Sequence, residues 1–145
     1  MTRTLASFCV AVLLAVVAAG QTAGKPQNVQ GLEITVKKIE RAASASLSDC
    51  PPGTNTVSAV TRPGEQFALV TVGFKVTPAF KPAPMKRPTV TDAADKNYFT
   101  PSQFVDVGSV PEFSCTFPFR VPEGTKLKAL HIESASVDLS ALDSK

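Results

Sequence analysis

The stretch "FSCTFPFRVPEG", residues 113–124, alternates apolar and polar side chains as a half-buried β-strand does. One face of this strand is an aromatic ladder that includes a cysteine: Phe113, Cys115, Phe117, Phe119 and Val121. The other face carries Pro118, which has no N–H to donate to a neighbouring strand. Pro118 is therefore expected on an edge strand or at a bulge.

The start of the chain has the features of a secretory signal peptide. Arg3 precedes an apolar run over residues 5–19, and the small residues around Gly20 suit a signal peptidase. A run of about 15 apolar residues is too short to span a bilayer comfortably. We therefore expect cleavage after Gly20, a secreted or periplasmic protein, and no membrane span in the mature chain.

Cleavage also removes Cys9 and leaves two cysteines, Cys50 and Cys115. In an oxidising compartment an isolated pair most simply forms one disulfide. The bond would close a loop of 65 residues and would contribute roughly 4 kcal/mol by chain entropy. Cys50 lies in "SASLSDCPPGTN", residues 44–55, which is expected to be a loop that the bond ties to the sheet.

The period of two continues along the mature chain. "LEITVKKI", residues 32–39, predicts a first strand with a bulge before Ile39, because the apolar face switches there. "EQFALVTVGFKVTP", residues 65–78, has apolar side chains on both faces and predicts a central strand.

The later part of the chain predicts shorter strands. Within "RPTVTDAADKNYFTP", two strands are expected near 89–91 and 98–99, around a polar turn. A last strand is expected in "KLKALHIES", residues 126–134, and "ASVDLSAL", residues 135–142, either continues it or forms a closing turn.

These features together predict an all-β protein. No window shows a sustained apolar period of 3.6 residues, so helix should be minor. About seven short strands, the turn signals and one disulfide predict a single antiparallel β-sandwich with immunoglobulin-like topology. The expected division is a signal peptide over 1–20, a flexible segment over 21–29, and an immunoglobulin-like domain over 30–142.

Four motifs also occur in the order seen in a known family: "GLEITV" (31–36), "GEQFALVTV" (64–72), "DAADKNY" (92–98) and "FRVP" (119–122). In them the chain resembles a family of secreted bacterial domains of unknown function, similar in fold to the immunoglobulin-like mycobacterial immunoprotective extracellular protein. The resemblance implies the fold and export, and it supplies no catalytic residues. The chain departs from the family's pattern at Asp95 and Lys96, where a glycine is common.

The sequence offers little support for catalysis, metal binding or nucleic-acid binding. Without Arg3 the charges nearly balance, and no basic stripe with stacking aromatics occurs, so nucleic acid is not an expected partner. His131 is the single histidine, expected on the strand face of Leu127 and Ala129, and a structural zinc or copper site needs more ligands. The stretch "DAADKN" lacks the ligand pattern of an EF-hand loop. We therefore expect no enzyme, no metal and no cofactor.

The densest basic stretch is "FKPAPMKRP", residues 80–88. A stiff solvated loop between strands explains it, and the functional alternative is a docking loop for an acidic partner. We expect a non-enzymatic module that binds an unknown protein or cell-envelope partner through loops or a sheet edge. The candidate contact residues are Lys81, Met85, Lys86 and Arg87. The alternative is a small-ligand or metal carrier that uses the sandwich interior, or Met85 and His131.

Overall fold

The computed structural model describes residues 24–46, 50, 58–82, 85–101 and 110–144. Ten strands occur in these ranges: β1 (Gln27–Val29), β2 (Leu32–Ala42), β3 (Ser44–Ala45), β4 (Ala59–Val60), β5 (Glu65–Val76), β6 (Thr89–Asp92), β7 (Asn97–Phe99), β8 (Glu112–Pro122), β9 (Leu127–Ile132) and β10 (Ala135–Asp138). The described part of the chain contains no helix, and hence none long and apolar enough to cross a membrane.

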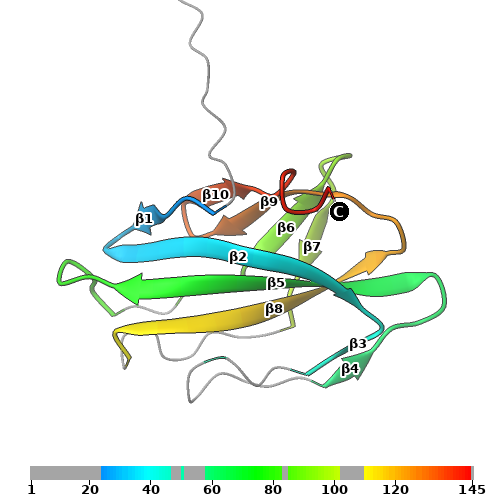
Figure 1. The fold of residues 1–145 in the computed structure, drawn as a ribbon, viewed down its shortest axis with the longest axis horizontal. Coiled ribbons are helices and arrows are strands. Elements are labelled where there is room, and N and C mark those ends of the chain that lie inside the picture. Colours follow the sequence, from blue (N-terminus) through cyan, green and yellow to red (C-terminus); the bar gives the residue numbers. More distant parts are fainter. Residues whose placement is uncertain (1–23, 47–49, 51–57, 83–84, 102–109, 145) are drawn as a thin grey trace, which may run out of the picture.

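The strands form two four-stranded sheets and one two-stranded sheet (Figure 1). The first large sheet has the order β1-β2-β5-β8, the second has the order β10-β9-β6-β7, and β3 pairs with β4. Every paired strand runs antiparallel to its neighbour. The predicted antiparallel β-sandwich is confirmed, and the order β2-β5-β8 opposite β10-β9-β6-β7 is an immunoglobulin-like Greek key.

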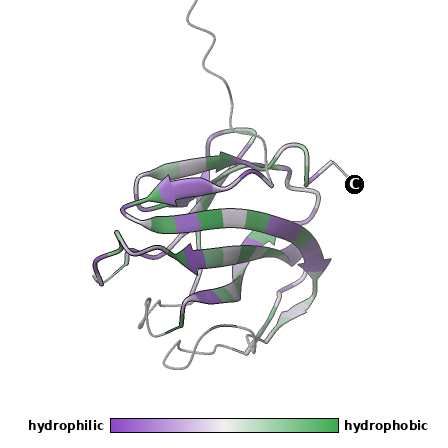
Figure 2. Ribbon diagram, turned by 60° about the vertical axis from the view of Figure 1, so that its left-hand side comes forward, coloured by the Kyte–Doolittle hydropathy of each residue, from purple (hydrophilic) through white to green (hydrophobic). Residues whose placement is uncertain are grey.

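The core lies between the two large sheets. Figure 2 shows the hydrophilic and hydrophobic bands that alternate along the long strands, as one buried face per strand requires. The largest side chains that are fully buried include Phe74 on β5, Phe117 and Phe119 on β8, and Leu130 on β9. The burial of Phe117 and Phe119 explains the predicted aromatic ladder, because every second residue of β8 faces the opposite sheet.

Strand β2 contains the predicted bulge. Val36 lies opposite Val72, but the next pair joins Lys38 to Thr71, so Lys37 is the extra residue. A bulge changes which residues of a strand face the core. After this one, Ile39 and the residues that alternate with it turn toward the second sheet.

The two longest predicted strands are placed as expected. Strand β5 lies between β2 and β8, so it is central. Strand β8 is the last strand of its sheet, and Pro118 pairs with Leu69 of β5. Because a proline on an edge strand can leave its N side without a ladder partner, the edge position confirms the expectation.

Four expectations about the strands and the domain need correction. Residues 27–29 were expected in a flexible segment, but they form β1 and pair with Leu32, Glu33 and Ile34. The domain also extends past residue 142, since Asp143 is buried. The stretch 44–55 begins with strand β3, and the C-terminal strands β9 and β10 are a hairpin whose turn holds Glu133 at a positive φ of 50°.

Candidate functional site

The candidate contact residues lie on the connection from β5 to β6, at one end of the sandwich. We call this end the basic pole and define it by Phe80, Lys81, Met85, Lys86 and Arg87. Residues 83 and 84 lie outside the described residues.

The start of this connection is fixed to the turn between β1 and β2. The backbone N–H and the Oγ1 hydroxyl of Thr77 both donate to the carbonyl oxygen of Gly31, at 3.0 and 2.6 Å. The N–H of Phe80 then donates to the carbonyl of Thr77 at 3.0 Å. Gly31 has a φ of 84°, and a Cβ there would lie 2.4 Å from the nitrogen of Phe80. Only glycine therefore allows this close approach of two backbones.

The end of the connection is fixed to the turn between β9 and β10. The backbone N–H of Lys86 donates to Glu133 Oε1 at 2.5 Å. The sequence did not predict this role of Glu133, because nothing in the local pattern indicates that the two turns meet. Hydrogen bonds to two separate turns thus anchor the two ends of this connection.

The side chains of the basic pole divide into an apolar base and a charged rim. Phe80 and Met85 are half-buried and pack against the core. Together with Val29 and Leu32 they line a notch of about 40 Å³, with Lys81 and Glu133 at its margin. Lys81, Lys86 and Arg87 are exposed, and no ion pair joins any of them to another described residue. Lys81 lines this small depression, and the exposed Lys86 and Arg87 follow Met85 in the chain.

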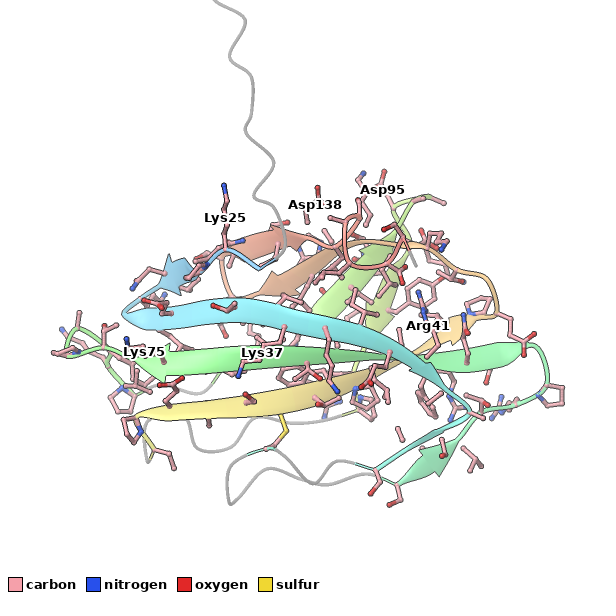
Figure 3. All side chains as sticks on the ribbon, viewed as in Figure 1. Lys25, Lys37, Arg41, Lys75, Asp95 and Asp138 are labelled. Atoms are coloured by element: carbon pink, nitrogen blue, oxygen red, sulfur yellow. A yellow bond between two sulfur atoms is a disulfide. The ribbon has the colours of Figure 1, made fainter. Side chains whose placement is uncertain are left out.

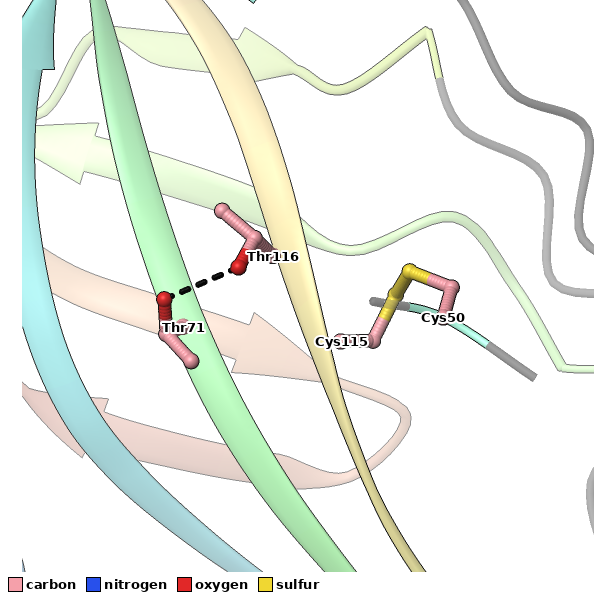
Figure 4. The surroundings of a disulfide bond; sticks show 4 residues. All are labelled: Cys50, Thr71, Cys115 and Thr116. Carbon is pink, nitrogen blue, oxygen red and sulfur yellow. Dashed lines mark hydrogen bonds between the residues drawn. A yellow bond between two sulfur atoms is a disulfide. The ribbon is translucent and has the colours of Figure 1, made fainter. Parts of the chain in front are cut away.

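The predicted disulfide between Cys50 and Cys115 is present (Figure 4). The Cys115 side chain is fully buried in the aromatic ladder, and Cys50 packs partly buried against the core. On the opposite face of the sheet the hydroxyls of Thr71 and Thr116 are hydrogen-bonded at 2.9 Å. The bond therefore attaches the chain between β3 and β4 to β8 at the edge of the sheet.

His131 does not lie where the alternation predicts. Strand β9 is irregular at Lys128, because Thr91 pairs with Ala129 while Asp92 pairs with Leu127. The extra residue places Leu127 in the core and leaves His131 on the outer face, 3.4 Å from the Thr91 hydroxyl. The shared face expected for Leu127 and His131 is therefore wrong.

No group of three or more potential metal ligands occurs among the described residues. Met85 lies at the notch of the basic pole, whereas the polar contact of His131 is with Thr91 on β6. Met85 and His131 therefore have different neighbouring residues.

The polar turn between β6 and β7 is explained by its own hydrogen bonds. Asp92 Oδ1 accepts the backbone N–H groups of Ala94 and Lys96, each at 2.9 Å, and Oδ2 accepts the Tyr98 hydroxyl at 2.9 Å. The N–H of Lys96 contributes most to a pKa of Asp92 below its usual range. Burial opposes this shift, and the Tyr98 hydroxyl and the N–H of Ala94 add to it. Burial, followed by the Asp92 carboxylate, raises the pKa of Tyr98.

Comparison with known proteins supports the fold alone. No protein-family model matches the chain, and no curated protein does. A crystal structure of an uncharacterized beta-sandwich protein from Clostridium difficile 630 is similar, with a TM-score of 0.50 and 9% sequence identity. The similarity covers 80% of this chain and 87% of that one. At this identity the match supports the β-sandwich and carries no information about a ligand.

Proposed function

We propose that this protein is an exported, non-enzymatic module that binds an acidic protein or cell-envelope partner through the basic pole. The observation that carries the proposal is that both ends of the connection are anchored while its cations are exposed. Thr77 and Lys86 hold the loop on two turns, while Lys81, Lys86 and Arg87 stay exposed. A connection whose two ends are already anchored loses less conformational entropy when it binds.

The two kinds of side chain at the pole would have separate roles. Exposed cations steer an acidic surface toward the pole and set its orientation. The notch beside Phe80 and Met85 is large enough for only a small apolar group, so it suits one aliphatic side chain as an anchor. The partner segment would therefore be acidic and would carry a single apolar residue.

Export is part of the proposal and is supported by three features. The apolar run over residues 5–19 suits a signal peptide, and the disulfide suits an oxidising compartment. The four motifs shared with the family of secreted bacterial domains suit the same route. We propose membership of that family on those motifs.

The test uses a fluorescent peptide of glutamates around one leucine as the probe. Reversing the charge of Lys81, Lys86 and Arg87 to glutamate together should abolish its binding, and added salt should weaken its binding to the unaltered protein. The matched control reverses three exposed cations elsewhere, Lys25, Lys38 and Arg62. Equal losses in both triple variants would show attraction to overall charge and would overturn the basic pole as the site.

A further inference from the structure

A second site lies on the outer face of the sheet β1-β2-β5-β8, away from the core. A groove of about 250 Å³ crosses β2 and β5 and reaches β8, with Gly73 at its base and Lys37, Lys75 and Glu112 among its walls. Figure 3 shows Lys37 and Lys75 on this face. We propose that this groove binds a small zwitterion of about dipeptide length, with its carboxylate at Lys37 and its ammonium at Glu33 and Glu112.

Lys37 is held across the sheet by the bulge in β2 and by the glycine in β5. Its amine donates to Ser114 Oγ on β8 at 2.7 Å. A Cβ on Gly73 would lie 2.6 Å from Lys37 Cε, so the side chain lies directly over the glycine. Glycine in the interior of a central strand weakens the strand and often marks a close approach. Because Gly73 has no side chain, the side chain of Lys37 can cross β5 at this position.

The ammonium group of Lys37 can donate hydrogen bonds to an anion. An ammonium group has three N–H donors, and the hydrogen bond that the structure gives it goes to the neutral Ser114 hydroxyl. No ion pair joins Lys37 to another residue in the described part of the chain. A ligand carboxylate beside Ser114 would form a charge-assisted hydrogen bond, which is stronger than a neutral one.

The opposite end of the groove carries a net negative charge, because two glutamates flank one lysine there. Glu33, Lys75 and Glu112 lie side by side on β2, β5 and β8. Their Cβ atoms are about 5 Å apart in such a row, yet within the described ranges no ion pair of 4.0 Å or less joins them. Both carboxylates can therefore accept hydrogen bonds from a ligand ammonium.

The spacing of the two charged ends defines the ligand. Along β5 the row at Lys75 is two residues from Gly73, which is about 7 Å of strand. An extended dipeptide separates its terminal charges by about the same distance. A molecule of this length can contact both ends together, whereas a single inorganic ion can contact only one.

The test is a titration with glycylglycine, followed by the backbone amide signals of the isotope-labelled protein. Saturable shifts are expected at Gly73 and Ser114, with millimolar affinity. N-acetylglycylglycine and glycylglycine amide, which lack one charge each, should bind at least about tenfold more weakly. Lys37→Gln and Glu112→Gln should cause similar losses. Lys38→Gln is the control, because Lys38 pairs with Glu40 and does not line the groove.

Unsaturated shifts with glycylglycine, equal binding of the blocked peptides, or an equal loss in Lys38→Gln would each overturn the proposal. The amide spectrum of every variant reports its fold in the same experiment. The result is independent of the basic pole, since Lys81, Lys86 and Arg87 do not line the groove.

Discussion

Arg41 on β2 binds Asp143, 102 residues later in the chain, with Nη2 at 2.7 Å from both carboxylate oxygens. The same Nη2 donates to the carbonyl of Thr125 at 2.9 Å, and Asp143 Oδ2 accepts the N–H of Leu127 at 2.6 Å. The bulge at Lys37 makes this contact possible, because it turns the later residues of β2 toward the second sheet. The pair joins β2 to the C-terminal segment (Figure 3 labels Arg41).

Replacing Asp143 with alanine should lower the free energy of unfolding by about 2–3 kcal/mol. The side chain of Asp143 is only 7% exposed and that of Arg41 is 27% exposed, so the variant leaves a largely buried guanidinium without its counter-ion. Urea unfolding measures the change. Lys38→Ala removes the exposed pair with Glu40 and should cost less than about 1 kcal/mol. Equal effects of the two substitutions would mean that the contact with Arg41 adds no more stability than an exposed ion pair.

Replacing both Cys50 and Cys115 with serine should lower the free energy of unfolding by about 4 kcal/mol, since the disulfide closes a 65-residue separation. Residual structure in the unfolded chain would reduce this value. Urea unfolding in the presence and absence of a reductant gives the measurement. The reductant should destabilise the unaltered protein and leave the double variant unchanged. Alkylation of Cys50 and Cys115 without prior reduction would contradict the bond.

Tyr98 is the single tyrosine, and the chain has no tryptophan, so phenolate absorbance reports this residue alone. Burial and the Asp92 carboxylate raise the pKa of Tyr98 in the folded state. The phenol should therefore titrate above its usual pKa of about 10. Asp92→Asn should lower that pKa, because the nearby negative charge is lost. A phenol that titrates at its usual pKa in the unaltered protein would contradict the contact.

The same raised pKa has a consequence for stability. The unfolded chain releases the phenol proton at lower pH than the folded chain does. The contribution of Tyr98 to the free energy of unfolding is therefore complete below about pH 10, and it is lost as pH rises through the folded pKa. Asp92 affects stability at acid pH, since its pKa is lowered in the folded state. Its contribution to the free energy of unfolding is present above about pH 3.9 and is lost as pH falls through the folded pKa. Tyr98→Phe should abolish the alkaline loss and reduce the acid loss only in part, because the N–H of Lys96, which lowers the Asp92 pKa most, remains. Urea unfolding across pH will measure both losses.

Asp95 occupies the left-handed region, with φ at 60°. Aspartate tolerates this conformation better than a β-branched residue does. Asp95→Val should destabilise the protein by about 1–2 kcal/mol, whereas Asp95→Gly should change stability little, because relief at φ offsets the greater freedom of the unfolded chain. Thermal unfolding compares the two variants. A valine variant as stable as the glycine variant would show that backbone conformation does not limit this position.

Short-range patterns in the sequence predicted the strands and their buried faces. The alternation in β8 depends only on neighbouring residues, and so does the change of face before Ile39, which is where the bulge occurs. Pro118 predicted an edge strand or a bulge, because a missing N–H is a property of the residue itself. The single disulfide followed from the two cysteines outside the expected signal peptide and the expected compartment.

Tertiary structure decided the contacts between distant segments. Lys86 meets Glu133, Arg41 meets Asp143, and Lys37 crosses Gly73 to reach Ser114. These contacts join different strands or turns, and local propensity does not specify which turns share one end of a sandwich. The irregularity at Lys128 escaped prediction for a related reason: one extra residue reverses the faces of a strand, and its position depends on pairing with β6.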